Sequence, residues 1–412
     1  MNTSSKQGVW SRNGLALRFP NLSGSIVLRD CEDLYRQLPL IFGGWVIDSI
    51  DDDQTPLVSV SRLGNGRYRV EAVWLDEGAE FDDPVDALCS LVAKVVRAWT
   101  MEQDDLLCLH GASVRIGGAL AVFPNRYRAG KSILTAALAA RGHDVYGDDV
   151  LPIRLAEGCG IAAGIAPRLR APYPDNLDKA TREYIETHAG LKGSRYHYLD
   201  LRQERLATLG SSAEIGAFVL LERDSGATPH LVPVPQAEVL RCVVWQNFAR
   251  EVNAHSILER LSQIVSSANC YRLVYDRVDD AADLLSASLV EQQARPLERF
   301  TGPSSPSGSR KDADNIPDGH FQRRIGIIEV SRDGESFLAD GDGASIHHLN
   351  PVGAAVWTLL KEPISPGQII DILQTAFPET DRDQIETDVY DLLKSLQRKQ
   401  LIINSDNCER PQ

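Results

Sequence analysis

The sequence predicts an α/β core preceded by a β-rich N-terminal region and followed by a small C-terminal α+β domain. Strand-like and helix-like segments alternate between residues 106 and 290. A segment poor in large apolar residues then interrupts the pattern, and beyond it three strand-like segments precede three helix-like ones, in the order βββααα. Since one domain typically takes roughly 100–200 residues, a chain of 412 residues is expected to hold more than one hydrophobic core.

Residues 1–100 are expected to form the β-rich region, closed by a helix. Short strand-like runs occur at 15–19, 58–60 and 68–74, and Gly64-Asn65-Gly66 is a turn signal between the last two. Helical periodicity follows from Pro84 to Trp99.

Residues 101–292 are expected to form the α/β core. An apolar strand at 119–123 leads through a short loop into a helix at 132–141, which Gly142 ends. A second apolar strand at 217–222 and a helix at 237–246 follow.

The loop between that first strand and helix reads PNRYRAGKSILTAAL over residues 124–138. A phosphate-binding loop wraps backbone N–H groups around anionic oxygens at a helix N-terminus, adds a lysine for the phosphates and places a hydroxyl on Mg²⁺. Asn125 stands where such a loop has its first glycine, and asparagine tolerates positive φ better than other non-glycine residues. The alternative is a chance Gly-Lys-Ser at a helix start. The predicted phosphate contacts are Asn125, Arg126, Arg128, Ala129, Gly130, Lys131, Ser132 and Ile133.

Acidic and imidazole side chains lie on either side of this loop in the sequence. Asp148 and Asp149 follow a strand-like segment, and His110 precedes the loop in CLHGASV. Phosphoryl transfer to an alcohol needs Mg²⁺ coordination and a base near the attacking hydroxyl, which an acidic pair can supply. Taken alone, such a pair is more often a turn or helix cap, and a lone histidine is more often packed in a strand than catalytic.

HGASV, then GKS, then RGH and an Asp-Asp pair, in this order and spacing, resemble the HPr kinase/phosphorylase family and its relatives. The resemblance implies a P-loop kinase core that uses ATP and Mg²⁺. It implies phosphate binding by Lys131, phosphate and metal binding by Ser132, a general base at Asp148 and a metal ligand at Asp149, with His110 in the active site. Asn125 and Arg128 replace family glycines and no phosphorolysis signature follows, which favours a kinase over a reversible phosphorylase. Arg168 and Arg170 suit either a phosphate clamp or a solvated surface.

Residues 293–322 are expected to be a flexible linker, because their Pro, Gly, Ser and Asp content cannot bury enough surface to offset the entropy of ordering. The C-terminal domain is expected over 323–403. Its expected strands are 326–330, 336–339 and 344–349, and its expected helices are 352–360, 366–376 and 382–399.

Residues 349–360 read LNPVGAAVWTLL and resemble the PqqD family, which recognises ribosomally made, modified peptides. The resemblance implies a winged-helix-like domain that binds a precursor's leader peptide. An extended leader would pair with a strand edge while its side chains enter a groove against a helix. The candidate peptide contacts are Ile346, His347, His348, Asp388, Tyr390 and Leu393. The alternative is a domain that only packs on the core.

Composition limits the other classes of function. The net charge of −14 disfavours nucleic acid as the main partner, since that partner selects a basic face. The sequence has neither a run of about 18 apolar residues nor an apolar secretory signal, so no membrane partner and a cytoplasmic location are expected. The seven cysteines are scattered without a CxxC pair, which suggests no zinc site and no disulfide framework.

The sequence therefore predicts an ATP- and Mg²⁺-dependent kinase for a Ser or Thr hydroxyl of a precursor peptide, with the leader held by the C-terminal domain. Two alternatives stay open: a non-catalytic adaptor that presents peptide to other peptide-modifying enzymes, and a kinase for a small alcohol or sugar. A homo-oligomer is compatible with the sequence.

Overall fold

The computed structural model describes residues 14–51, 54–103, 105–124, 129–247, 253–290, 319–341, 343 and 345–407. Contacts divide these residues into two compact units. The first holds the described residues up to 234 together with 245–247 and 267–290, and the second holds 235–244, 253–266 and those from 319 onward.

Six short strands open the first unit: β1 (Leu15–Arg18), β2 (Ile26–Arg29), β3 (Asp48–Ile50), β4 (Val58–Arg62), β5 (Tyr68–Ala72) and β6 (Ala79–Phe81). They form one sheet in the order β3-β1-β2-β4-β5-β6, antiparallel except for the parallel pair β2 and β4. The short helices α1 (Glu32–Tyr35) and α2 (Leu38–Ile41) lie between β2 and β3 in the chain. The predicted β-rich region is confirmed.

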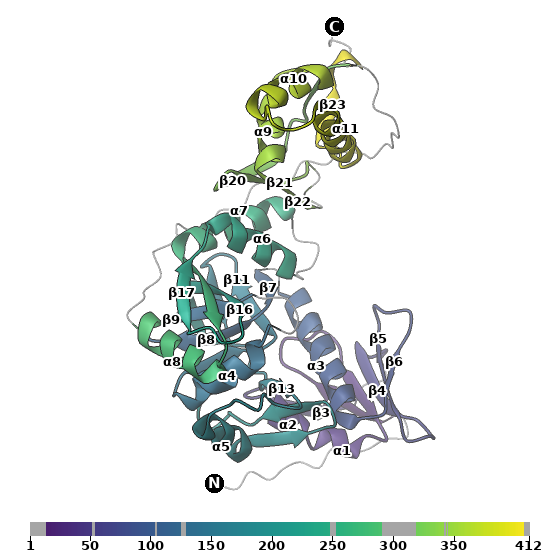
Figure 1. The fold of residues 1–412 in the computed structure, drawn as a ribbon. Coiled ribbons are helices and arrows are strands. Elements are labelled where there is room, and N and C mark those ends of the chain that lie inside the picture. The colour runs from purple at the N-terminus through teal and green to yellow at the C-terminus, as the bar shows by residue number, and fades with distance from the viewer. Residues whose placement is uncertain are drawn as a thin grey trace. The chain divides into compact units, whose positions relative to one another are not determined.

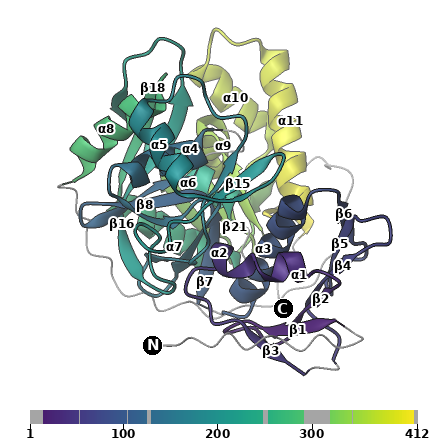
Figure 2. The same ribbon diagram turned by 90° about the horizontal axis from the view of Figure 1, so that it is seen from below.

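Helix α3 (Pro84–Met101) lies between this sheet and the larger one that follows (Figures 1 and 2). The Asp83 side chain caps it by accepting from Val85 N at 2.7 Å, and Pro84 occupies its first turn. Its buried residues share one core with the six-stranded sheet and with parts of the larger sheet, including Leu106 and Ile161. This packing fixes the position of α3, one face of which lines a cavity together with Asp148 and Asp149.

The larger sheet has nine strands among the described residues: β7 (Leu106–His110), β8 (Ala112–Ile116), β9 (Ala119–Phe123), β10 (Asp144–Gly147), β11 (Val150–Arg154), β12 (Cys159–Ile161), β16 (Ser212–Arg223), β17 (His230–Pro233) and β18 (Asn269–Tyr275). Their order is β10-β8-β9-β16-β12-β11-β7, with β18 also beside β16 and β17 beside β18. β16 runs parallel to both β9 and β18. The carboxyl ends of these three strands therefore meet at one edge of the sheet.

Helices α4 (Lys131–Ala140), α5 (Lys179–Thr187) and α8 (Val278–Leu289) share a core with this sheet (Figure 1). A three-stranded sheet, β13-β15-β14, adds β13 (Arg168–Arg170), β14 (Ala189–Lys192) and β15 (Tyr196–Leu199). The predicted strand at 119–123 and helix at 132–141 are confirmed as β9 and α4, and residues 125–128 of the predicted loop between them lie outside the described part of the chain.

The second unit contains the predicted C-terminal elements. Its strands are β19 (Phe321–Arg323), β20 (Ile328–Arg332), β21 (Glu335–Ala339), β22 (Ile346–Leu349) and β23 (Ile402–Asn404). Its C-terminal helices are α9 (Pro351–Leu359), α10 (Pro366–Ala376) and α11 (Arg382–Arg398), followed by a short 3-10 turn at Ser405–Asn407. β20, β21 and β22 form an antiparallel sheet, and β19 pairs with β23. The order βββααα is confirmed, with one flanking strand at each end.

Two caps explain where these helices begin. The Asn350 side chain accepts from Gly353 N at 2.9 Å, and Ser365 forms a capping box with Gln368. The helices bury a core around Trp357, which is 1% exposed.

The prediction that all of residues 101–292 belong to the α/β core needs correction, because α6 (Gln236–Gln246) and α7 (Ala254–Ser267) group mostly with the C-terminal elements. The Ala237 N–H donates to Asp333 Oδ2 at 2.9 Å, and Arg241 pairs with Glu335 at 3.1 Å. The predicted linker lies mostly outside the described residues, and its last two residues, 321 and 322, already belong to β19.

Candidate active site

The start of α4 is held in a conformation that requires glycine. Gly130 has φ of +89°, and a Cβ there would lie 2.8 Å from the Tyr275 hydroxyl oxygen. That hydroxyl donates to Ala129 O at 3.4 Å. Gly130 is the N-cap residue of α4, and the N–H groups at the N-terminus of a helix favour the binding of an anion. The predicted contacts Asn125, Arg126 and Arg128 lie outside the described residues and stay predictions.

A basic pocket of about 460 Å³ lies in front of this helix start. Lys131, Arg168, Arg170 and Arg223 contribute its positive charges, and Asp149 contributes a negative one. The predicted residues that line it are His110, Ala129, Gly130, Lys131, Ser132, Ile133 and Asp149. A pocket with four cations beside a helix N-terminus suits a multiply charged anion such as a nucleotide phosphate.

The chain brings His110 to this pocket through strand pairing. β11 runs antiparallel to β7 and places Val150 opposite His110, so the histidine lies beside the Asp148-Asp149 pair that precedes β11. Burial lowers the pKa of His110, and the Lys131 charge lowers it further. His110 is therefore neutral at neutral pH and can donate or accept one hydrogen bond, but it does not add a positive charge.

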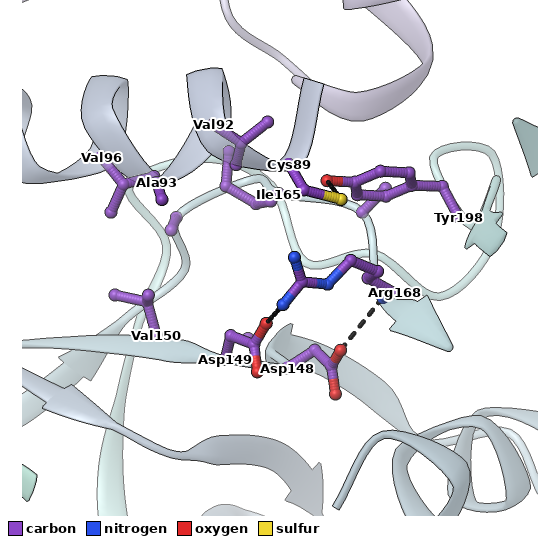
Figure 3. A pocket seen from close by; sticks show the side chains of 13 residues that line it. Cys89, Val92, Ala93, Val96, Asp148, Asp149, Val150, Ile165, Arg168 and Tyr198 are labelled. Carbon is purple, nitrogen blue, oxygen red and sulfur yellow. Dashed lines mark hydrogen bonds and ion pairs between the residues drawn. The ribbon is translucent and has the colours of Figure 1, made fainter. Parts of the chain in front are cut away.

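The two carboxylates differ in their surroundings (Figure 3). Asp149 pairs with the Arg168 guanidinium at 2.5 Å and is partly exposed. Asp148 is 5% exposed, and its Oδ2 accepts from the Arg168 backbone N–H at 3.0 Å. Its Oδ1 has no hydrogen-bond partner among the described residues.

Burial, and next the Asp149 charge, raise the pKa of Asp148 from 3.8 to about 7, although the Arg168 N–H and the Ser132 hydroxyl act in the opposite direction. A buried carboxylate with a pKa near neutrality suits proton abstraction, because it is basic enough to accept a proton and still ionised in much of the protein.

Ser132 and Asp149, the predicted metal ligands, line the same pocket. Mg²⁺ prefers oxygen donors and usually takes one or two carboxylates together with water and substrate phosphates. The donor set of one hydroxyl and one carboxylate fits this preference. The described residues contain no group of three or more His, Cys, Asp or Glu side chains that could hold a metal by themselves.

Sequence reasoning missed Tyr196 and Arg223. Arg223 ends β16, parallel to β9, and the carboxyl ends of parallel strands are where ligands of open α/β sheets bind. The Tyr196 hydroxyl accepts from Arg170 at 2.8 Å, and its ring lies 4.5 Å from the Arg168 guanidinium. Arg168 and Arg170, for which a surface role was equally open, thus line the pocket.

The C-terminal candidates lie in the second unit. β22 is an end strand of its sheet, so among the described residues its outer edge has no partner strand. Of its residues, His348 pairs with Glu335 at 2.5 Å, and burial and the Lys399 charge lower the pKa of His347. Ile346 is half-buried.

On α11, Asp388 is exposed and accepts from Gln384 Nε2 at 2.8 Å, and Tyr390 is half-buried. Leu393 is 0% exposed and belongs to the core around Trp357. Its predicted contact with a peptide needs correction, since the folded domain leaves its side chain no surface to offer. It follows Val389 on the helical stripe that forms the core.

The family model for coenzyme PQQ synthesis protein D (PqqD) matches residues 335–402. The C-terminal elements from β21 to β23 therefore form a PqqD-like domain. Among curated proteins, no relative matches the chain. Among solved structures, "TbiB1 in Complex with the TbiA(beta) Leader Peptide" is 25% identical over 21% of this chain and 99% of that chain, with a TM-score of 0.19. No helix of the described residues is long and apolar enough to cross a membrane.

Proposed function

We propose that this chain is an ATP-dependent kinase that phosphorylates a Ser or Thr hydroxyl of a precursor peptide, and that its PqqD-like domain holds the leader of that peptide. One observation carries the proposal: the basic pocket at the start of α4 adjoins a buried carboxylate whose pKa is raised to about 7. Phosphate binding and proton abstraction are the two tasks that transfer to an alcohol requires.

Each side chain of the site has a distinct role in this proposal. The helix N–H groups and Lys131 bind the β- and γ-phosphates of ATP, and Arg168 and Arg170 stabilise the negative charge of the transferring group. Asp148 accepts the proton of the attacking hydroxyl while the new O–P bond forms and ADP leaves. Ser132 and Asp149 would hold Mg²⁺, which neutralises phosphate charge when bound.

Peptide capture is proposed for the outer edge of β22. An extended segment can add to an unpaired strand edge through backbone hydrogen bonds. Tethering the leader there raises the effective concentration of the attached core peptide, which reaches the millimolar range for short flexible links. Binding and transfer can therefore lie on separate surfaces.

Titration with ATP tests the phosphate site. Lys131→Ala is expected to weaken ATP binding at least tenfold, because a charge-assisted contact to phosphate is lost. Lys94→Ala is the matched control, since Lys94 is a partly buried lysine of α3 that does not line the pocket. Equal ATP affinity in the wild type and the Lys131 variant would favour the non-catalytic adaptor.

A comparison of two substrates tests the role of the leader. The intact enzyme is given a complete precursor or its leaderless core, and phosphate incorporation is followed by mass spectrometry. Leader-guided transfer predicts a much higher kcat/KM for the complete precursor, and free leader added in excess should inhibit it. Equal kcat/KM for both would instead point to a kinase that ignores the leader, as expected for a small-alcohol or sugar kinase.

A further inference from the structure

A second cavity, of about 90 Å³, adjoins the basic pocket, and Asp149 and Arg168 line both. Its character differs from that of the basic pocket. Cys89, Val92 and Val96, which recur at helical spacing on α3, form one wall. Figure 3 shows these side chains facing the Asp148-Asp149 pair across the cavity.

The remaining wall is also mostly apolar. Val150 and Ile165 line it from the strand and loop beside α3, and the Tyr198 hydroxyl donates to Cys89 Sγ at 3.4 Å. Ala93 lines the cavity and is exposed, so the cavity reaches the surface of the unit beside α3. Charged groups are restricted to the side formed by Asp148, Asp149 and Arg168.

We infer that this cavity binds an aliphatic side chain of the residue next to the acceptor Ser or Thr, and so selects substrates with Val, Ile or Leu beside the phosphorylated hydroxyl. The inference rests on the proposed function, because it places the acceptor hydroxyl at Asp148. Consecutive Cα atoms are about 3.8 Å apart, so a residue adjacent to a hydroxyl held there can extend its side chain into a cavity that borders the same carboxylate.

The size and polarity of the cavity restrict the occupant. A cavity of about 150 Å³ accommodates benzene in a well-studied apolar core, so 90 Å³ suits a branched aliphatic side chain better than an aromatic ring. An acidic side chain is excluded, because it would lose its hydration in an apolar space beside two carboxylates. Transfer of an apolar group from water favours occupation.

Synthetic peptides Gly-X-Ser-X-Gly, with X as Ala, Val, Leu, Phe or Asp, test this inference on the full chain. Carrying X on both sides of the serine removes any dependence on peptide direction. Dissociation constants are measured by saturation-transfer NMR with a non-hydrolysable ATP analogue present, and phosphate transfer from ATP is measured separately. The Val and Leu peptides are expected to bind about tenfold or more tightly than the Ala peptide, the scale of discrimination for added methylenes in an apolar pocket. The Phe and Asp peptides are expected to bind more weakly than the Leu peptide.

Ala93→Leu narrows the cavity at its exposed side and is expected to remove most of the preference for Leu over Ala, while the Ala peptide still binds. Ala287→Leu, an exposed alanine of α8 in the same unit, makes the same chemical change outside the cavity and should keep the preference.

The two measurements separate the two proposals. Equal dissociation constants for all X, no binding, or a preference that Ala93→Leu leaves intact would overturn the cavity assignment, whatever the transfer assay gives. A normal preference for Leu in binding without phosphate transfer to any peptide would support the cavity and count against the kinase.

Discussion

Asp148→Asn is expected to make the protein more stable above neutral pH while abolishing phosphate transfer. The pKa of Asp148 is raised in the folded protein to about 7 from 3.8, first by burial. The folded state therefore binds more protons than the unfolded chain between these values, and stability falls as the pH rises from about 4 through 7. At about 1.4 kcal/mol for each pKa unit, this difference corresponds to about 4 kcal/mol at pH 8.

Asparagine removes the ionisation and keeps an oxygen that can accept from the Arg168 N–H, now 3.0 Å from Asp148 Oδ2. Its NH₂ group replaces Oδ1, which has no partner in the described part of the chain, and a buried unsatisfied donor costs about 1–3 kcal/mol. The net gain at pH 8 is thus expected to be about 1–3 kcal/mol. The charge effect alone should reduce wild-type stability by about 3 kcal/mol between pH 5 and pH 8.

Urea unfolding of both proteins at pH 5 and pH 8 measures this difference, because contributions from other titrating groups cancel in the comparison. Asp224→Asn, at an exposed carboxyl of the same unit, is the control and should leave the wild-type pH dependence unchanged. If Asp148→Asn follows the wild-type pH dependence, the carboxylate does not carry a raised pKa, and the assignment of Asp148 as the base loses its physical basis.

Two further substitutions test the framework of the two units. Gly130→Ala should weaken ATP binding and lower the melting temperature. Alanine at φ of +89° is strained by roughly 1–2 kcal/mol, and its Cβ would lie 2.8 Å from the Tyr275 hydroxyl oxygen. Adding Tyr275→Phe should remove only the steric part of this loss, and full recovery of the melting temperature would show that the backbone conformation is not limiting. Trp357→Ala should destabilise the PqqD-like domain by about 3–5 kcal/mol, since this side chain is 1% exposed and the Arg323 guanidinium lies 4.4 Å from its ring. Chemical unfolding measures the change, and a decrease in the free energy of unfolding below about 1 kcal/mol would contradict the described core.

Local patterns predicted most of the individual elements. Asp83 and Pro84 mark the start of α3, and Asn350 and Ser365 cap α9 and α10, so these helix starts depend on residues adjacent in the sequence. The Gly-Lys-Ser motif at the start of α4 likewise identified Gly130, Lys131 and Ser132, which line the basic pocket.

Contacts between distant segments were beyond local patterns. Arg223 and Tyr196 reach the pocket only because β16 lies beside β9 and β15 beside β13. The apolar stripe of α3 identifies a buried face, but the cavity beside Val92 forms only once the segment with Ile165 packs nearby. Leu393 shows a second limit of local patterns. Helical spacing alone does not distinguish apolar residues that form the core from apolar residues that bind a partner.

The interleaving of α6 and α7 with the C-terminal elements bears on how this chain can be re-engineered. β17 and β18 are paired neighbours in the first unit, yet the segment between them supplies His255, whose Nε2 contacts Asp340 O at 2.5 Å in the second. A chimera that exchanges only the residues after position 320 would place the β20–β22 sheet of another protein against α6 and α7 of this chain, whose side chains would not match it. Exchange of the second unit as a whole therefore calls for two crossovers, with residues 235–266 transplanted together with the C-terminal portion.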